Sequence, residues 1–169
     1  MTLQLWGRPS SARTQKVMLA LSELNLTYEF IKASATMGPK GSVSRGKTPY
    51  GIVNTTEYLE KNPNGTIPTI SDEGFILWES NAIVQYLGMK YNPKLFYDAN
   101  IETFASASRW MMWENNQLIP PMHDLAKHLY RLPENQRDEN VVRTSKEKLF
   151  LEFQKVEVQL SKTRFISGD

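Results

Sequence analysis

The chain has no cysteine among its 169 residues. Cysteine nucleophiles, dithiol redox chemistry, disulfides and cysteine metal sites are therefore excluded together. An apolar run of transmembrane length is also missing, and the N-terminal strand-like segment is followed by Gly-Arg-Pro instead of the apolar core of a signal peptide. These last two absences predict a soluble, cytoplasmic protein.

A strong excess of charge of one sign is missing as well. The net charge is only +2, so electrostatics gives no reason to expect a nucleic-acid partner. The composition, 40% hydrophobic and 22% charged, is that of an ordinary globular protein. His123 and His128 lie five residues apart without a nearby carboxylate cluster, so the sequence predicts no metal site.

Periodicity divides the chain into a mixed α/β part and an all-helical part. The expected strands are 2–6, 27–31, 67–70 and 75–78, and the expected helices between them are 12–24, 57–61 and 80–90. This order predicts a mixed four-stranded sheet. Later segments are helical, with an interruption at Pro120-Pro121 and a last helix over 139–162. We therefore expect domains at 1–90 and 99–169, joined by a linker at 91–98.

Pro68 lies inside a predicted strand, although proline has no N–H for a strand ladder. A cis Ile67–Pro68 bond would resolve the conflict, and because only about 5% of such bonds are cis, it would indicate a purpose. The backbone of Ile67 would then face a ligand. Glu79 and Ser80 begin a predicted helix, where anions bind, although a capping pair is the structural alternative.

Three segments of the chain resemble the cytosolic glutathione transferases, in particular bacterial members of the serine type. They are Gly7-Arg8-Pro9-Ser10-Ser11 with Lys16-Val17, then NPNGTIPTI at 62–70, then LWESNAIVQYL at 77–87. The resemblance implies a thioredoxin-like N-terminal domain followed by an all-α C-terminal domain. The last residues, 165–169, resemble the start of a segment that continues into a further core helix. We therefore expect the helical domain to be incomplete here and to expose apolar surface.

The resemblance also implies a role for one serine. A free thiol has a pKa of about 8.5 and is only a few per cent thiolate at neutral pH, so the enzyme must lower the pKa of bound glutathione. Ser11 is expected to do so by donating a hydrogen bond to the sulfur. Ser10 is the close alternative, and Thr14 is a more distant one. The structural alternative for Ser11 is a helix cap.

The remaining contacts with glutathione are implied in the same way. Ile67 and Pro68 would hold the cysteinyl part through the main chain, while Glu79 would meet the γ-glutamyl ammonium and Ser80 its carboxylate. The glycyl carboxylate is expected to find a cation in the preceding loop, where each candidate is equally well explained as a solvated residue. These candidates are Lys40, Arg45 and Lys47.

Trp113 is the residue nominated for the pocket of the second substrate, although aromatic residues at helical spacing more often belong to a core. The leading hypothesis is a homodimeric transferase that conjugates glutathione to a small hydrophobic electrophile, with no metal, nucleic-acid or membrane partner. The alternative is a glutathione-binding or regulatory module without transferase activity. The presence of Pro68, Glu79 and Ser80 favours the transferase, because a purely structural domain needs no glutathione contacts.

Overall fold

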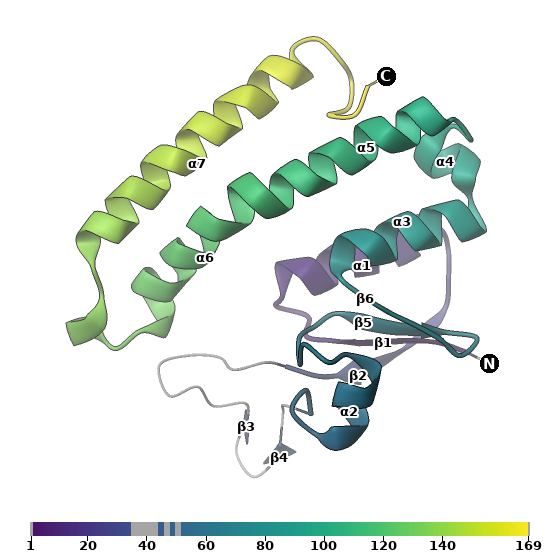
Figure 1. The fold of residues 1–169 in the computed structure, drawn as a ribbon, viewed down its shortest axis with the longest axis horizontal. Coiled ribbons are helices and arrows are strands. Elements are labelled where there is room, and N and C mark those ends of the chain that lie inside the picture. The colour runs from purple at the N-terminus through teal and green to yellow at the C-terminus, as the bar shows by residue number, and fades with distance from the viewer. Residues whose placement is uncertain (1, 35–43, 46–47, 50–51, 169) are drawn as a thin grey trace. The chain divides into compact units, whose positions relative to one another are not determined.

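The computed structural model describes residues 2–34, 44–45, 48–49 and 52–168. The chain forms two compact units, residues 1–96 and 97–169. The first unit is built on a four-stranded sheet, and the second is helical (Figure 1). This arrangement confirms the predicted α/β unit followed by an all-α unit.

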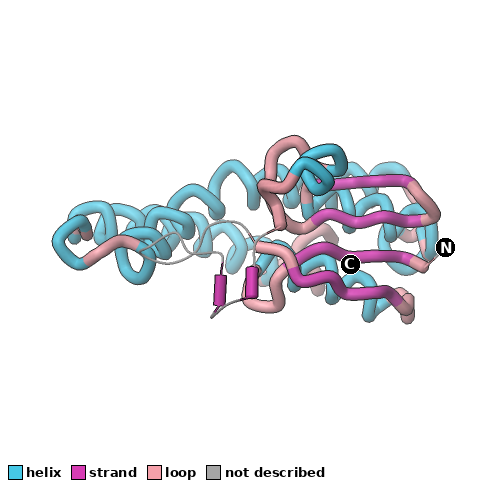
Figure 2. Tube along the Cα trace, turned by 90° about the horizontal axis from the view of Figure 1, so that it is seen from below, coloured by secondary structure: helices cyan, strands magenta, loops and turns pink. Residues whose placement is uncertain are grey.

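The sheet of the first unit has the strand order β2-β1-β5-β6 (Figure 2). β1 and β2 are parallel, whereas β5 is antiparallel to both β1 and β6, so the sheet is mixed as predicted. A separate short pair, β3 with β4, is antiparallel. The strands are β1 (Leu3–Gly7), β2 (Tyr28–Lys32), β3 (Ser44–Arg45), β4 (Thr48–Pro49), β5 (Thr69–Asp72) and β6 (Phe75–Trp78).

Helices cover both faces of this sheet. α1 and α3 lie on one face and α2 on the other (Figure 1). Alternate side chains of β1 point to opposite faces: Trp6 packs in a cluster with Tyr58 of α2, whereas Leu5 is fully buried on the other side of the strand. The helices are α1 (Ala12–Glu23), α2 (Thr56–Lys61), α3 (Ser80–Tyr91) and α4 (Pro93–Tyr97).

Two boundaries differ from the sequence expectation. The strand expected over 67–70 begins at Thr69, because Pro68 has no N–H to offer a ladder and therefore precedes the strand. Residues 93–97, inside the expected linker, form the short helix α4. The other strand and helix ends of this unit lie within one or two residues of the predicted positions.

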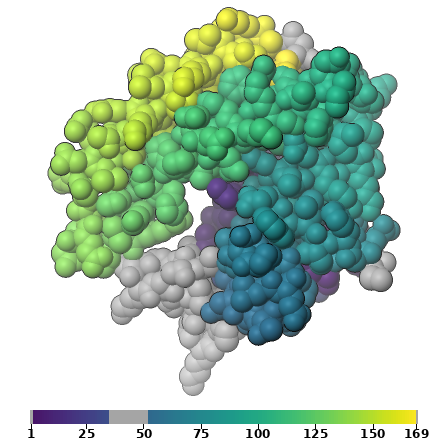
Figure 3. Space-filling model, in the orientation of Figure 1, coloured from purple at the N-terminus to yellow at the C-terminus, as the bar shows by residue number. Residues whose placement is uncertain are grey.

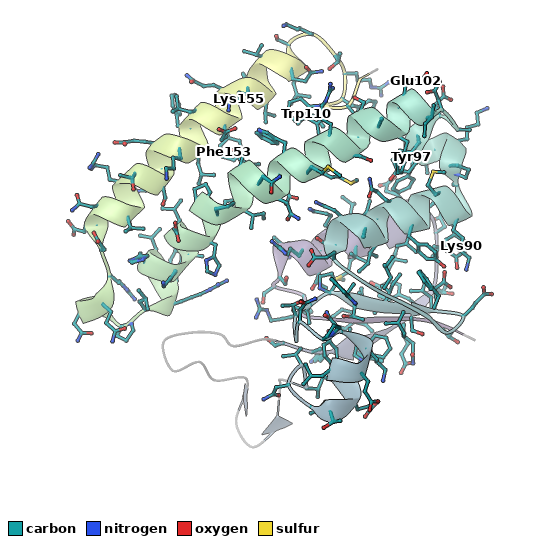
Figure 4. All side chains as sticks on the ribbon, in the orientation of Figure 1. Lys90, Tyr97, Glu102, Trp110, Phe153 and Lys155 are labelled. Carbon is teal, nitrogen blue, oxygen red and sulfur yellow. The ribbon has the colours of Figure 1, made fainter. Side chains whose placement is uncertain are left out.

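A buried carboxylate fastens the C-terminal end of α3 to the β5–β6 hairpin. Asp72, 2% exposed, accepts hydrogen bonds from the hydroxyls of Tyr86 and Tyr91 and from the ammonium of Lys90, each at 2.8 Å. Figure 4 marks Lys90 at this end of α3. Burial alone would raise the pKa of Asp72, but the bonds from Lys90, Tyr86 and Tyr91 outweigh it and hold that pKa below its usual value. The same bond to Asp72, with one to Glu73, raises the pKa of Lys90.

The second unit contains a long helical segment followed by a second long helix. The sequence predicts an interruption of the helix at Pro120-Pro121. The regular winding of α5 does end, but before the prolines: α5 leads through a π-helical turn, in which the Ile119 N–H donates to the Glu114 carbonyl, into α6, which begins at Ile119. Pro120 and Pro121 lie in the first turn of α6, directly after this π turn. The elements are α5 (Ile101–Trp113), the π turn (Glu114–Leu118), α6 (Ile119–Ala126), a second π turn (Lys127–Arg131), a 3₁₀ turn (Glu134–Gln136) and α7 (Glu139–Leu160).

Side-chain caps and one indole bond hold these helices. Asn100 caps α5 and Asp138 caps α7, each by accepting hydrogen bonds from two backbone N–H groups. Trp113 donates its indole N–H to Glu152 of α7 at 3.0 Å and packs edge-on against Trp110, with ring centroids 5.2 Å apart. Figure 4 shows Trp110 on the side of α5 that faces α7. Within the described residues, no helix is long and apolar enough to cross a membrane.

Candidate functional site

The sheet register brings the predicted site residues to one edge of the first unit. Trp6 of β1 pairs with Thr69 of β5, which in turn pairs with Trp78 of β6. Because β5 runs antiparallel to its two neighbours, β1 and β6 end near this row while β5 begins there. The segments next to the row are therefore the three that the sequence singled out, carrying Ser11, the Ile67–Pro68 bond, and Glu79 with Ser80.

Ser11 is the N-cap residue of α1 and is partly exposed. Its hydroxyl oxygen accepts a long hydrogen bond, 3.4 Å, from the Thr14 N–H. A serine hydroxyl has two lone pairs and one donor hydrogen, so capping uses an acceptor position and leaves the O–H able to donate. The structural and functional interpretations of Ser11 are therefore compatible. The adjacent helix terminus carries partial positive charge, which favours an anion.

The two alternatives to Ser11 occupy different surroundings. Ser10 is exposed in the turn before α1. Thr14 is fully buried, and its hydroxyl accepts a hydrogen bond from the Arg8 N–H at 3.4 Å. A Cβ added to Gly7 would lie 2.5 Å from the Thr14 side chain, so the glycine lets the end of β1 approach α1 closely. Burial under this turn makes Thr14 the poorest of the three candidates for contact with a ligand.

The Ile67–Pro68 peptide bond is cis, and Pro68 is buried. Two buried side chains that the sequence analysis did not select brace this turn. The Tyr58 hydroxyl donates to the Thr66 carbonyl at 2.6 Å and lies 2.9 Å from the Thr69 hydroxyl. The Asn62 amide donates to the same two oxygens, at 2.9 and 3.0 Å. Both residues flanking Ile67–Pro68 are thus held by the same pair of side chains.

This bracing is enclosed by the protein. Asn62 is fully buried and Tyr58 is 2% exposed, and burial raises the pKa of the Tyr58 hydroxyl despite hydrogen bonds to Thr69 and Asn62 that lower it. Buried polar groups are costly unless hydrogen-bonded, so this cluster fixes one geometry for the turn. The NPNG segment suggested only a turn, and nothing in its pattern indicated that Asn62 points inward.

Glu79 and Ser80 form the start of α3, as predicted. Glu79 has a positive φ of 73° and makes no capping hydrogen bond with its side chain. Few residues other than glycine adopt this backbone region, and such conformations cluster at functional sites. Ser80 is the first residue of the helix and is only 3% exposed. The absence of a capping bond argues against the interpretation of Glu79 as a simple cap.

The N-terminal turns of α1 and α3 are joined by two polar contacts. Lys16 donates to the Asn81 side-chain oxygen at 2.7 Å. Arg13 lies 3.8 Å from the Glu79 carboxylate, measured from Nη1 to Oε2, with both side chains partly exposed. These contacts place two cationic side chains of α1 beside the start of α3.

Several predicted residues are not brought into this arrangement. Lys40 and Lys47 lie outside the described residues, and the side chain of Arg45 is not described. Trp113 belongs to the second unit, where its indole N–H is bonded to Glu152; its role toward an electrophile stays a prediction. Among the described residues, no group of His, Asp and Glu side chains could hold a metal ion.

The second unit also contains a cavity of about 640 Å³ beside the start of α7. Side chains of both charge signs line it, and two of them, Arg143 and Glu147, are paired with each other at 2.9 Å. No residue selected for glutathione or electrophile binding belongs to its lining. Ser11, Ile67, Pro68, Glu79 and Ser80 lie instead near one end of the sheet in the first unit.

Comparison with known proteins shows which family this chain is similar to. Residues 5–95 match the family model of the glutathione S-transferase N-terminal domain. The chain is 34% identical over 169 residues to glutathione S-transferase GstB of Escherichia coli K12, with 99% of this chain and 75% of the relative covered. It is 27% identical over 170 residues to the probable glutathione S-transferase GSTF2 of rice, covering 99% of this chain and 73% of that one.

Solved structures show the same similarity. A theta class glutathione S-transferase from Xanthomonas axonopodis pv. citri, determined with glutathione bound, superposes with a TM-score of 0.84 at 28% identity, covering 99% of this chain and 75% of its own. Poplar glutathione transferase F1 gives a TM-score of 0.80 at 27% identity, covering 100% and 74%. The similarity therefore extends through both units of the fold.

Proposed function

Because the chain belongs to the glutathione S-transferase family, we propose that it binds reduced glutathione and transfers it to a small hydrophobic electrophile. The observation that carries this proposal is the meeting of three segments at one sheet edge: the Ser11 turn, the Ile67–Pro68 turn and the start of α3. Each segment supplies a group suited to a different part of the tripeptide. The glutathione-bound relative with the same fold supports this assignment.

The proposed chemistry depends on lowering the pKa of the glutathione thiol. The Ser11 O–H donates a hydrogen bond to the sulfur, which favours the charged form, and the α1 terminus adds a favourable electrostatic contribution. The thiolate then attacks the electrophile: a carbon–sulfur bond forms and the leaving group departs, or the electron pair moves onto an activated double bond. No covalent bond to the protein is needed, so catalysis rests on positioning and electrostatic stabilisation.

The remaining groups orient the tripeptide. The main chain of Ile67, next to Pro68, holds the cysteinyl part in a turn that Tyr58 and Asn62 brace. Glu79 binds the γ-glutamyl ammonium, and the Ser80 hydroxyl and N–H bind its carboxylate. Lys40 and Lys47 are proposed for the glycyl carboxylate, and Trp113 for the electrophile. We also propose that the protein acts in the cytoplasm as a homodimer.

Binding to immobilised glutathione, followed by titration of the bound thiol, tests the proposal. We expect binding, a thiol pKa below the free value of about 8.5, and a return toward that value in Ser11→Ala. Conjugation of a chromogenic aryl halide should fall about 100-fold in kcat/KM, as for loss of one transition-state donor. Ser10→Ala, a neighbouring exposed serine, is the matched control and should change neither quantity.

The outcomes separate the two candidate functions. Failure of the wild-type chain to bind glutathione would overturn the proposal. Binding with an unshifted thiol pKa and no conjugation would instead establish the glutathione-binding module without transferase activity. A pKa that responds to Ser10→Ala and not to Ser11→Ala would move the thiolate contact to Ser10.

A further inference from the structure

The polar side chains buried beside the Ile67–Pro68 turn form a directional series of hydrogen bonds. The Tyr58 hydroxyl donates its single hydrogen to the Thr66 carbonyl at 2.6 Å. At its 2.9 Å contact with the Thr69 hydroxyl, Tyr58 is therefore the acceptor and Thr69 is the donor. Asn62 begins the series by donating an amide hydrogen to the Thr69 hydroxyl at 3.0 Å. Every hydrogen in the series thus points along one path, which ends at the Thr66 carbonyl.

The carbonyl at the end of this series belongs to the same peptide unit as the Ile67 N–H. Ile67–Pro68 is the one cis bond among the described residues, so the Thr66–Ile67 bond is trans. A trans peptide unit is planar, and its C=O and N–H point in opposite directions. Tyr58 and Asn62 occupy both lone pairs of the carbonyl, at 2.6 and 2.9 Å. Fixing the carbonyl from the buried side therefore also fixes the Ile67 N–H, which points away from these two side chains.

The Ile67 N–H is a donor that the fold itself does not use. Among the described residues, no backbone or side-chain group accepts a hydrogen bond from it, and β5 begins only at Thr69, so it is outside the sheet ladder. Ile67 is partly exposed. Hydrogen bonds in series polarise one another, so the two bonds to the Thr66 carbonyl make the N–H at the other end of the amide a better donor. An oriented and polarised N–H of this kind is suited to a ligand acceptor.

We propose that Tyr58 is a positioning residue, whose hydroxyl acts through the Thr66 carbonyl to aim the Ile67 N–H at the cysteinyl carbonyl of glutathione. The cysteinyl main chain offers one donor and one acceptor, and only the acceptor, its carbonyl oxygen, can pair with an N–H. Tyr58 itself is 2% exposed, too buried to touch a ligand directly. Burial raises the pKa of its hydroxyl, so the group keeps the hydrogen that it donates. The inference rests on the proposed function, because it assumes that glutathione binds at this turn.

The test is a cycle that removes either the Tyr58 hydroxyl or the ligand group that the Ile67 N–H contacts. Calorimetry compares wild type with Tyr58→Phe, using glutathione and an analogue in which an (E)-alkene replaces the cysteinyl–glycine amide. The analogue keeps the planar shape and lacks the carbonyl, so wild type should bind it more weakly than glutathione. We expect Tyr58→Phe to weaken glutathione binding about fivefold, the effect of one hydrogen bond. Binding of the analogue should change by less than about twofold.

Two further variants make the result specific. Tyr91→Phe makes the same chemical change at a hydroxyl that donates to Asp72 at 2.8 Å, at the opposite end of β5. It should lower the free energy of unfolding and leave both affinities unchanged; a loss of glutathione affinity equal to that of Tyr58→Phe would contradict a specific role for Tyr58. Thr69→Val interrupts the series one step earlier and should weaken glutathione binding about twofold without affecting the analogue. It carries the same comparison if Tyr58→Phe does not fold.

Three results would overturn the inference while leaving the proposed function standing. An equal loss of affinity for both ligands in Tyr58→Phe would mean that the hydroxyl only supports the fold. Unchanged affinity for glutathione would mean that it does not position the N–H. Equal affinity of the wild-type chain for the two ligands would mean that the Ile67 N–H does not contact the cysteinyl carbonyl. Absence of glutathione binding by the wild-type chain is a different result, because it removes the proposed function and the inference together.

Discussion

The two units bury their apolar side chains to very different degrees. In the first unit, six aliphatic side chains from strands and helices are fully enclosed: Leu5, Val17, Leu21, Ile70, Ile83 and Leu87. In the described part of the second unit, the buried hydrophobic residues are Tyr97 and Leu149, while α7 leaves Phe150, Leu151 and Phe153 more than half exposed. Figure 3 shows much of α7 at the surface in yellow-green.

The difference shows where the proposed glutathione site obtains its rigidity. Ser11, Pro68 and Glu79 are attached to the ends of elements whose other side chains form the enclosed core of the first unit. The apolar periodicity of α7 indicates that a face of this helix is apolar, but not what packs against it. Amphipathic patterning is therefore a weaker guide to burial in the second unit than in the first.

Truncating one leucine in each unit should give the largest difference in stability between the two units. Leu21→Ala removes a fully buried side chain from the first unit and should lower the free energy of unfolding by about 3 kcal/mol. Leu151→Ala, at a position 57% exposed on α7, should change it by less than about 0.5 kcal/mol. Urea unfolding followed by tryptophan fluorescence measures both values. Similar losses in the free energy of unfolding for the two variants would mean that the exposed fraction of a leucine does not reflect its contribution to stability.

The buried carboxylate of Asp72 allows the same comparison of stability contributions for polar side chains. Asp72→Asn replaces a buried carboxylate that serves three donors, and should cost about 2 kcal/mol at pH 7. Its native pKa is lowered, so its contribution is complete above the unfolded pKa of about 3.9 and is lost as pH falls through the native value. The stability gap between wild type and variant should therefore narrow below about pH 4.

An exposed ion pair of the second unit provides the control for this experiment. Glu147→Gln removes the carboxylate that pairs with Arg143, where both side chains are more than half exposed. It should change stability by less than about 0.5 kcal/mol, and added salt should reduce even this effect. A gap for Asp72→Asn that stays constant down to pH 2 would contradict the assignment of its ionised state.

Apart from the two control variants, the smallest effect is expected at the indole bond of the second unit. Trp113→Phe removes the hydrogen bond to Glu152 while retaining an aromatic ring beside Trp110, and should cost about 1 kcal/mol. Glu152→Gln keeps an acceptor for the indole and should cost less. If Trp113→Phe leaves stability unchanged but alters the KM for an electrophile, the residue acts on the substrate and not on the packing of α5 with α7.

Much of the first unit could be predicted because its local signals agree with one another. Alternation located β1, β2 and β6 to within one residue, and the segment containing Pro68 was recognised as abnormal for a strand. The four-stranded mixed sheet then follows from the order of its elements. The register that aligns Trp6, Thr69 and Trp78 could not be obtained in this way, because pairing depends on contacts between distant segments.

The supporting side chains of the site were not predictable for a related reason. Tyr58 and Asn62 have ordinary surface-compatible sequence contexts, and only the fold shows that both are buried against the Thr66–Thr69 turn. The approach of Arg13 to Glu79 joins residues far apart in the chain. At Pro120-Pro121 the local rule indicated a break in regular α-helical winding, but it could not show that the break is a π turn that lies before the prolines.

The π turn before α6 has a consequence for the helical phase of the second unit. A π turn holds one residue more than an α-helical turn, and each residue of an α-helix advances the side-chain direction by about 100°. Because the π turn fits this extra residue into about one turn of rotation, deleting a single residue from Glu114–Leu118 would return the segment to plain α-helical winding and leave the side chains of α6 in nearly the same direction relative to those of α5. The π turn thus absorbs one additional residue while α6 keeps the face that it presents to α7.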